Sequence, residues 1–259
     1  MRQTIYTRVI LLLLVSVPLS GLVAQTTTKN YVAKYTARTE QSTALAGNGD
    51  ESEVTAEFSY FDGLGRPIQT IIRKGSGSLT PKDVVMGKLY DNYGRPDKQP
   101  LGYEATTTDG SFHADFTVDL EAFYANPPAA VSDNTYPYAK QTFDDSPIQR
   151  VLEESSPGET WKPSSEGGTH VVDFEYGVND EDEVVKLEVD LSVDLQITKS
   201  MYPISELRFT KTTDENGNTS TVYTNLNGQT VCKQLTSEYG YVRTFYVYNS
   251  FGLLTMVIP

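Results

Sequence analysis

The sequence is poor in residues that bind metals or cross-link a chain. Its 259 residues include one cysteine, Cys232, and two histidines, His113 and His170. A single cysteine cannot form an internal disulfide, and two histidines leave few ligands for a zinc site. A chain of this length buries a sizeable core without such cross-links. We therefore expect no cofactor and no zinc chemistry.

Basic residues and long apolar segments are also scarce. The chain has 21 Lys and Arg residues against 34 Asp and Glu residues, a formal net charge of -13. Surfaces that bind nucleic acid neutralise phosphates with Lys and Arg, so this balance argues against a nucleic-acid partner. Beyond residue 24 no apolar stretch approaches the length of a bilayer span, and we expect no integral membrane span.

The first 24 residues have the pattern of a cleavable export signal. Arg2 and Arg8 supply positive charge, an apolar run covers Val9–Val17, and the segment ends at the small residue Ala24. We expect cleavage after Ala24 and export to the periplasm, the cell surface or the medium. The alternative is an anchored single-pass protein, although the apolar run is short for a permanent span.

The rest of the chain is typical of short strands separated by turns. Seventeen Tyr and ten Phe residues favour strands, and 19 Gly and 13 Pro residues favour turns. Residues 25–50 are expected to form a flexible leader with one strand. The predicted strands, from two-residue alternation and β-branched or aromatic content, are Asn30–Ala37, Val54–Tyr60, Pro67–Ile72, Val185–Leu195, Leu207–Thr212, Thr219–Thr224, Thr230–Leu235 and Tyr241–Tyr248.

The middle of the chain, Tyr103–Met201, is less regular. Val118–Ala125 predicts one short helix, which Pro127 and Pro128 would stop. The expected fold class is therefore all-β, with antiparallel, hairpin-rich sheets.

One short motif recurs along the chain. Phe61–Pro67 and Tyr90–Pro96 share the order aromatic, Asp, two free positions, Gly, Arg, Pro. Looser copies keep Asp or Asn (Asx) with a glycine three positions later, and Phe143-Asp144 keeps only the opening. We expect each Asx oxygen to accept backbone N–H groups of a turn and each glycine to supply a positive φ. The predicted turn residues are Asp62, Gly65, Arg66, Asp91, Gly94, Arg95, Asp214, Gly217, Asn225, Gly228, Asn249 and Gly252.

These copies resemble the tyrosine-aspartate (YD) repeats of Rhs-type bacterial surface and toxin proteins. Other segments are similar to the uncharacterised leader domain at the front of exported YD-repeat proteins. They are Asp109–Phe112, Tyr136–Tyr138, Ser146–Glu153, Pro157–Trp161 and Phe174–Gly177. The resemblance covers about Glu51 to Pro259 and implies a β-rich leader domain over residues 51–205. YD-like hairpin repeats then follow over residues 206–259, open at the carboxyl end.

For function, the resemblance implies a β ribbon that coils into a hollow shell, often around a variable carboxy-terminal toxin. It implies that this chain is an exported structural or interaction module without catalysis of its own. Because the sequence ends at Pro259, just after a repeat begins, we expect the front part of a longer protein, a truncated reading frame or a free-standing remnant.

Three other functions are left open by the residues. Exposed tyrosines can stack on sugar rings in a glycan-binding or adhesive module, whereas the structural interpretation predicts the same rings buried. A hydrolase would need His113 or His170 beside acids, Cys232 or a serine, and no supporting spacing occurs. Asp180 and Asp182 are a calcium candidate, although the usual calcium-loop pattern is absent. The tyrosines in question are Tyr223, Tyr239, Tyr241, Tyr246 and Tyr248.

The last segment of the chain is strongly apolar. A free edge strand of this composition invites pairing with another strand. We therefore expect the remainder of a longer chain, or a partner strand, to cover Tyr246–Ile258.

Overall fold

The computed structural model of the chain describes residues 28–38, 54–190 and 196–259. Within these ranges it has sixteen strands, the α-helix α1 (Phe116–Ala125) and the 3₁₀ helix η1 (Ser164–Glu166). This confirms the all-β, antiparallel class with one short helix. The predicted signal peptide and most of the predicted leader lie outside the described residues.

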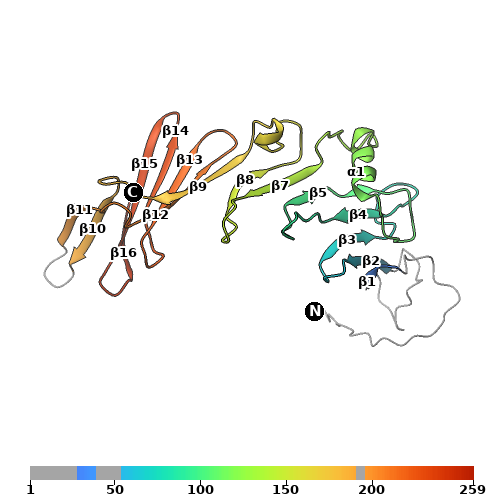
Figure 1. Cartoon of the computed structure of the whole chain (residues 1–259), viewed down its shortest axis with the longest axis horizontal. Coiled ribbons are helices and arrows are strands. Elements are labelled where there is room, and N and C mark those ends of the chain that lie inside the picture. Colours follow the sequence, from blue (N-terminus) through green and yellow to red (C-terminus); the bar gives the residue numbers. More distant parts are fainter. Residues whose placement is uncertain (1–27, 39–53, 191–195) are drawn as a thin grey trace, which may run out of the picture.

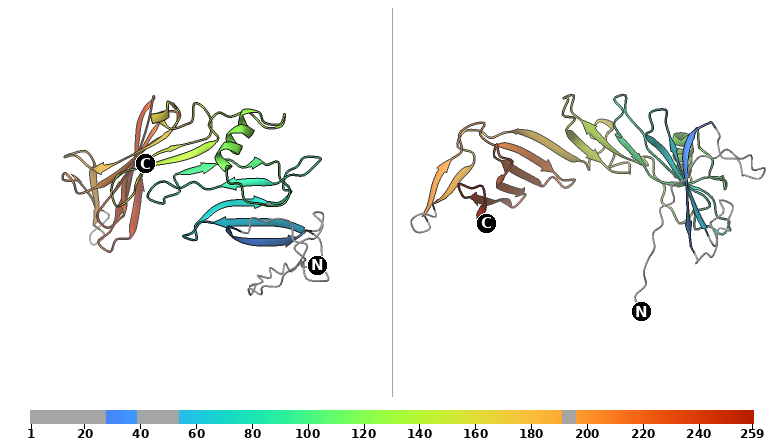
Figure 2. Two further views of the ribbon diagram at one scale, coloured as in Figure 1. Left: turned by 45° about the vertical axis from the view of Figure 1, so that its right-hand side comes forward. Right: turned by 90° about the horizontal axis from the view of Figure 1, so that it is seen from below.

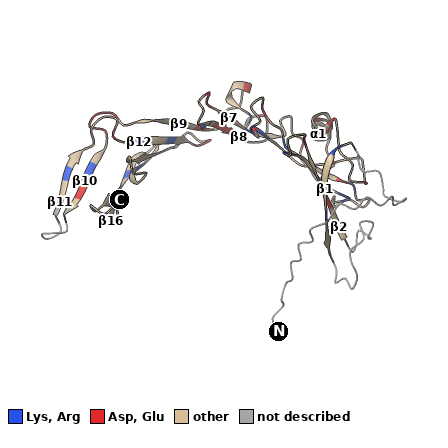
Figure 3. Ribbon diagram, turned by 60° about the horizontal axis from the view of Figure 1, so that its bottom comes forward, with Lys and Arg blue, Asp and Glu red and all other residues tan. Residues whose placement is uncertain are grey.

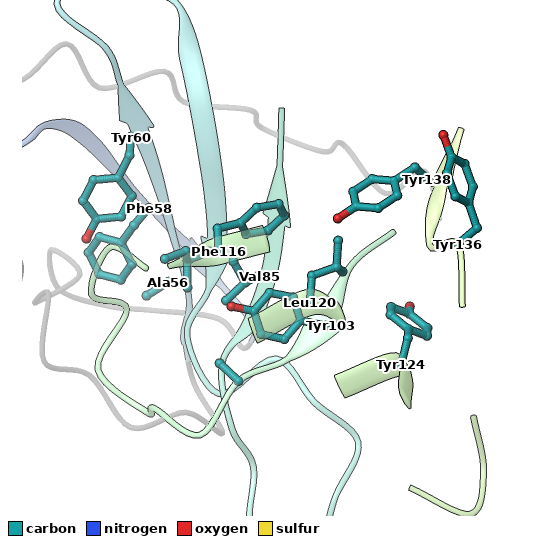
Figure 4. Close-up of a cluster of buried hydrophobic side chains, with 12 residues drawn as sticks. Ala56, Phe58, Tyr60, Val85, Tyr103, Phe116, Leu120, Tyr124, Tyr136 and Tyr138 are labelled. Atoms are coloured by element: carbon teal, nitrogen blue, oxygen red, sulfur yellow. The ribbon is translucent and has the colours of Figure 1, made fainter. Parts of the chain in front are cut away.

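The amino-terminal sheet has five strands in the order β1-β2-β3-β4-β6. Alternate residues of β2 are buried, among them Phe58 and Tyr60, which lie against Gly110 and Phe112 of the loop before α1. The helix adds Phe116 and Leu120 to the same core (Figure 4). A side chain at Gly87 would lie 2.3 Å from the Phe116 ring, so this glycine makes room for the helix. The strands are β1 (Asn30–Ala37), β2 (Val54–Phe61), β3 (Pro67–Ile72), β4 (Val84–Gly87) and β6 (Tyr103–Glu104).

A second sheet has nine strands in the order β16-β15-β14-β13-β12-β9-β8-β7-β5. β9 pairs with β12, so the ladder continues across residue 205, where the sequence predicts a domain boundary. Among the described residues β16 has a strand partner on one side only. The strands are β5 (Lys98–Pro100), β7 (Tyr138–Phe143), β8 (Val151–Ser155), β9 (Val172–Val178), β12 (Arg208–Thr213), β13 (Thr219–Thr224), β14 (Thr230–Ser237), β15 (Gly240–Tyr248) and β16 (Leu254–Ile258).

Between β9 and β12 the chain forms a separate hairpin of β10 (Val185–Asp190) and β11 (Gln196–Met201). The alternation predicted one strand over Val185–Leu195. Instead β10 ends at Asp190, which pairs antiparallel with Gln196, and residues 191–195 lie outside the described residues. Alternation shows which side chains share a face, but it does not show where a strand ends.

The β10–β11 hairpin lies against one face of the second sheet and closes a second core. The buried residues of this core include Val184, Leu207, Tyr223 and Cys232, with Phe245 packed beside them. The guanidinium of Arg243 donates a hydrogen bond of 3.1 Å to a backbone carbonyl at the start of the hairpin, which attaches the hairpin to β15.

The two sheets follow one another along a curved ribbon (Figures 1 and 2). Leu89, just beyond β4, forms an antiparallel bridge with Lys98 of β5, which links the first sheet to the second. With the bottom of the molecule turned forward, the ribbon bends into an arc (Figure 3). No helix in the described part of the chain is long and apolar enough to cross a membrane.

Candidate functional site

The repeated motif folds into one kind of turn, which we call an Asx corner. In the first corner the Asp62 N–H donates to the Arg66 carbonyl at 2.9 Å, and the Gly65 N–H donates to the Asp62 carbonyl at 3.1 Å. Asp62 Oδ1 accepts the backbone N–H groups of Leu64 and Arg66, each at 2.9 Å. Gly65 has a φ of +79°, which a side chain would resist.

Four more corners have the same bonds over the same five-residue span. Their glycines have φ values between +77° and +82°, and each Asx oxygen accepts two backbone N–H groups. The structure thus places all twelve predicted turn residues in corners of one geometry. The four corners begin at Asp91, Asp214, Asn225 and Asn249.

Two further corners are longer. The Asp144 N–H donates to the Arg150 carbonyl and the Arg150 N–H donates to Asp144 Oδ1, each at 2.9 Å, and Gln149 takes the positive φ, +56°, that glycine has elsewhere. Asn179 pairs in the same way with Leu207, and the β10–β11 hairpin is an insertion within this corner. The sequence motif did not identify the Asn179 corner, because its closing residue lies 28 positions away.

The Asn179 side chain is fully buried and holds the base of the insertion together. Its Oδ1 accepts the Leu207 N–H at 2.7 Å, and its Nδ2 donates to the carbonyls of Asp180 at 2.9 Å and Pro203 at 2.8 Å. Ser205, two residues before Leu207, has a φ of +64° and donates its N–H to the Asn179 carbonyl at 3.0 Å, as the glycine does in the shorter corners.

Strand direction puts six of the seven corners along one margin of the ribbon. Because every neighbouring pair is antiparallel, β2, β4, β7, β9, β13 and β15 all run the same way, and each leads into a corner. In Figure 1 the β7–β8 and β15–β16 turns lie on the lower margin and α1 on the upper one. We call this set the corner row: Asp62, Asp91, Asp144, Asn179, Asn225 and Asn249. The Asp214 corner lies on the opposite margin.

Neighbouring corners of the row are joined by a repeated hydroxyl bond. A Tyr or Thr on the strand that enters one corner donates to the carbonyl of the first residue after the preceding corner. The four bonds are Tyr90 to Pro67 at 2.8 Å, Tyr176 to Val151 at 2.9 Å, Thr224 to Arg208 at 3.3 Å and Tyr248 to Thr230 at 3.0 Å. We call these bonds staples.

The last residue of a corner also reaches forward to the next corner. The guanidiniums of Arg66, Arg95 and Arg150 lie over the rings of Tyr90, Phe143 and Tyr176, 4.4, 4.5 and 4.9 Å from the ring centroids. Gln229 instead donates from Nε2 to the Gly252 carbonyl at 2.9 Å. The sequence motif covered only part of these joints: Tyr90, Phe143 and Tyr248 directly precede an Asx, and Arg66 and Arg95 lie four residues after one. Tyr176, Thr224 and Arg150 do not follow that pattern.

The corner carboxylates are held in their charged form. Arg66 Nε donates to Asp62 Oδ2 at 2.7 Å, and Arg95 Nε donates to Asp91 Oδ2 at 2.6 Å. The backbone N–H of Arg66 is the largest cause of the lowered pKa of Asp62. Around Asp91 desolvation opposes the shift, but the hydrogen bonds from Arg95 outweigh it and the pKa is again lowered.

The pKa of each of the other two corner aspartates is also lowered. The Asn218 side chain is the largest cause of the lowered pKa of Asp214. For Asp144, desolvation is outweighed by hydrogen bonds from Ser146 and Arg150, and the pKa is lowered.

Acid is expected to weaken the aspartate corners. Because their folded-state pKa lies below the ordinary 3.8, they stabilise the fold above that pH, and this contribution is lost as the pH falls through the lowered values. A variant with Asn at all four positions keeps the Oδ1 acceptor, as Asn225 shows, and should lose less stability on acidification. Melting temperatures at about pH 6 and pH 3 measure this.

Asp173 is the internal control for that experiment. Partial desolvation, aided by the charge of Glu153, raises the pKa of Asp173. Asp173 therefore has the opposite pH dependence, and it is unchanged in both proteins. Equal losses of melting temperature in the parent and the fourfold variant would show that the corner carboxylates are not responsible.

The calcium candidates are not brought together with further ligands. Asp180 and Asp182 are exposed, and Asp182 has a φ of +58°. The described residues contain no group of three or more His, Cys, Asp or Glu side chains placed to hold a metal ion.

The candidate catalytic residues lie in separate places. His113 Nε2 is 3.1 Å from Thr107 Oγ1, and His113 Nδ1 is 3.4 Å from Asp119 Oδ2. The Thr107 hydroxyl donates its proton to Asp83 and therefore not to His113. The His170 ring lies 5.0 Å from that of Trp161. Cys232 is packed in the second core, and burial raises the pKa of its thiol, contrary to what a nucleophile needs.

The five tyrosines named above in the carboxy-terminal strands differ in their exposure to solvent. Tyr223 is buried, and Tyr246 and Tyr248 are partly buried. The expectation that all five rings are buried is wrong for Tyr239 and Tyr241, which are exposed. These two lie at the β14–β15 turn, away from the core that the β10–β11 hairpin closes.

The fold and its corners define an all-β ribbon protein whose strand pairs are joined at repeated Asx turns. The chain belongs to the family described as "Domain of unknown function (DUF6443)", which it matches over residues 33–177. No curated protein sequence matches it.

Among solved structures the chain is similar to one titled "Crystal Structure of TcdB2-TccC3 without hypervariable C-terminal region". The two share 15% sequence identity with a TM-score of 0.47, and the match covers 81% of this chain. The chain spans only 9% of the length of that chain.

Proposed function

We propose that this protein is an exported structural module, the front part of a YD-repeat shell protein of Rhs type. Its role is to build and present a β ribbon, and it has no catalysis of its own. The proposal rests on the resemblance of the YD motifs and on the bonds that the described corners make in the fold.

One observation carries the proposal: both the corners and the bonds that join successive corners are repeated along the ribbon. Four staples use a hydroxyl on the incoming strand and the carbonyl just after the previous corner. A joint of this kind adds one strand pair to the ribbon without needing a closed core, because its partners come from neighbouring rungs. Such repeated hydrogen bonds suit a scaffold that is extended by adding strand pairs of the same kind.

The last corner already has the acceptor for another joint. Asn249–Ile258 aligns with Asn225–Gln234, so Leu254 takes the position of Thr230, whose carbonyl accepts the Tyr248 hydroxyl. Leu254 begins β16, the edge strand of the second sheet. Under this proposal β16 is the growing edge, which a further strand of the same protein covers.

A duplication tests this role. Replacing Pro259 with a second copy of Leu235–Leu253 continues β16 in the register of β14. We expect the added strand to pair with β16, slow the exchange of its backbone amides at least tenfold and raise the melting temperature. Hydrogen exchange read by mass spectrometry measures the first effect.

Two controls make the result specific. An extension of scrambled sequence should leave β16 unprotected. Changing the added copy's equivalent of Tyr248 to Phe removes the new staple and should remove part of the gain. The ribbon-building role is contradicted if the added copy is digested by protease while β16 exchanges at its original rate.

Export is tested separately on the full chain in its own host. We expect the mature protein to begin at Gln25 and to be recovered outside the cytoplasm, by amino-terminal mass analysis of fractionated cells. A product that keeps residues 1–24 in the cytoplasm would rule out this part of the proposal.

A further inference from the structure

Every corner of the row carries a large apolar side chain at its tip. The exposed fractions of these side chains run from 60% at Ile204 to 87% at Phe251. In five of the six corners the apolar residue directly precedes the residue with positive φ, and in the Asn225 corner it is one position earlier. The tip residues are Leu64, Tyr93, Ile148, Ile204, Leu226 and Phe251.

The corner fold itself does not require apolar tips. The Asp214 corner has the same hydrogen bonds and a glycine φ of +82°, but its tip residues are Glu215 and Asn216. This corner lies on the opposite margin. Exposed apolar residues also occur there, at Leu79 and Tyr239, but they lie outside Asx corners. The apolar tips therefore follow the margin rather than the turn type.

The six Asx positions of the row carry no unpaired charge. The chain has a formal net charge of -13, so two copies repel one another on average. Along the row, Asp62, Asp91 and Asp144 are each paired with an arginine of their own corner, and the other three corners use uncharged asparagine. The Asx side chains thus add no net charge where two margins would meet, whereas the exposed Asp145 and Glu206 add negative charge within two of the corners. Attraction between two rows therefore comes from their apolar tips.

Spacing and area identify the occupant. Successive tips are two strands apart, about 9–10 Å, and a row with the same spacing can place its tips between them. Each exposed tip offers on the order of 100 Å² or more, so six tips approach the roughly 800 Å² that each partner buries in a standard interface. A second corner row meets both requirements, because it has the same spacing and the same apolar tips.

We propose that the corner row is an interface between ribbon margins, and that a second copy of this chain occupies it, row against row. This rests on the ribbon-building role proposed above. The ribbon-building role and the row interface can be disproved separately, because the first depends on the β16 edge and the second on the strand ends.

Sedimentation equilibrium of the exported chain over a wide concentration range tests the interface. The row variant Tyr93→Glu, Leu226→Glu, Phe251→Glu places charge on three exposed tips. We expect the parent to dimerise and the row variant to weaken association at least tenfold. Melting temperature and circular dichroism check that the variant is folded, and Phe251→Glu alone replaces it if it is not.

Two matched controls locate the contact. Tyr239→Glu puts the same charge on an exposed aromatic of the opposite margin, and Val257→Lys puts a charge on the β16 edge. Both should dimerise like the parent. The proposal is overturned if the parent is monomeric throughout, or if Val257→Lys abolishes association while the row variant keeps it. The second result would leave the growing edge of the ribbon-building role intact.

Discussion

Replacing Asn179 with alanine is expected to lower the free energy of unfolding by about 3 kcal/mol. The side chain is fully buried and satisfies three backbone groups, the N–H of Leu207 and the carbonyls of Asp180 and Pro203. Leu207 is itself fully buried, so its N–H would lose its partner with no access to water. The loss is therefore the cost of unpaired buried groups rather than of one exposed hydrogen bond.

Urea unfolding of the two proteins measures this effect, and Asn249→Ala is the matched control. Asn249 makes the same turn bonds but is only partly buried, so its removal should cost about 1 kcal/mol. Similar losses in the two variants would show that the insertion does not depend on its corner. Asn179→Asp keeps Oδ1 but brings a buried charge and loses both donated bonds, and it should also destabilise the fold.

Phe58→Ala is expected to cost about 4 kcal/mol, because the ring is fully buried at the centre of the first core. The Phe58 ring occupies the space beside Gly110, where an added side-chain carbon would lie 2.5 Å from the ring. Gly110 also has a φ of +78°, and its carbonyl accepts the Tyr60 hydroxyl at 2.6 Å. Gly110→Ala should therefore cost about 2–3 kcal/mol through strain and overpacking.

The double variant separates these causes. Without the Phe58 ring the added methyl of Gly110→Ala no longer clashes, and only the backbone strain remains. We expect the combined loss to be smaller than the sum of the single losses by at least about 1 kcal/mol. Additive losses in a double-mutant cycle by chemical denaturation would refute the contact between these two positions.

The sequence was most informative where structure depends on neighbouring residues. The strands Pro67–Ile72 and Thr219–Thr224 have the predicted bounds, since β-branched runs and adjacent turn residues define them locally. The corners at Asp62 and Asn225 close within five residues, so the motif alone located them. Alternation failed at Val185–Leu195, because it does not show where β10 ends and β11 begins.

The joints between corners required the tertiary structure. Tyr90 and Pro67 are 23 positions apart, and Tyr176 and Val151 are 25 positions apart. Each half of such a bond is an ordinary residue in the sequence, and only sheet pairing brings the halves together. The sequence motif shows an aromatic residue before the Asx but not the hydroxyl bond that joins one strand pair to the next.

By itself the sequence determined the strand class, the Asx corners and the apolar character of the last strand, because these follow from the conformational preferences of adjacent residues. Only the tertiary structure decided that six corners share one margin while the Asp214 corner lies on the other, and that Asn179 closes a corner with Leu207. The reason is that strand direction and long-range pairing depend on the order in which strands join the sheet. Two turns of the same local geometry can therefore present their side chains on opposite margins of one ribbon.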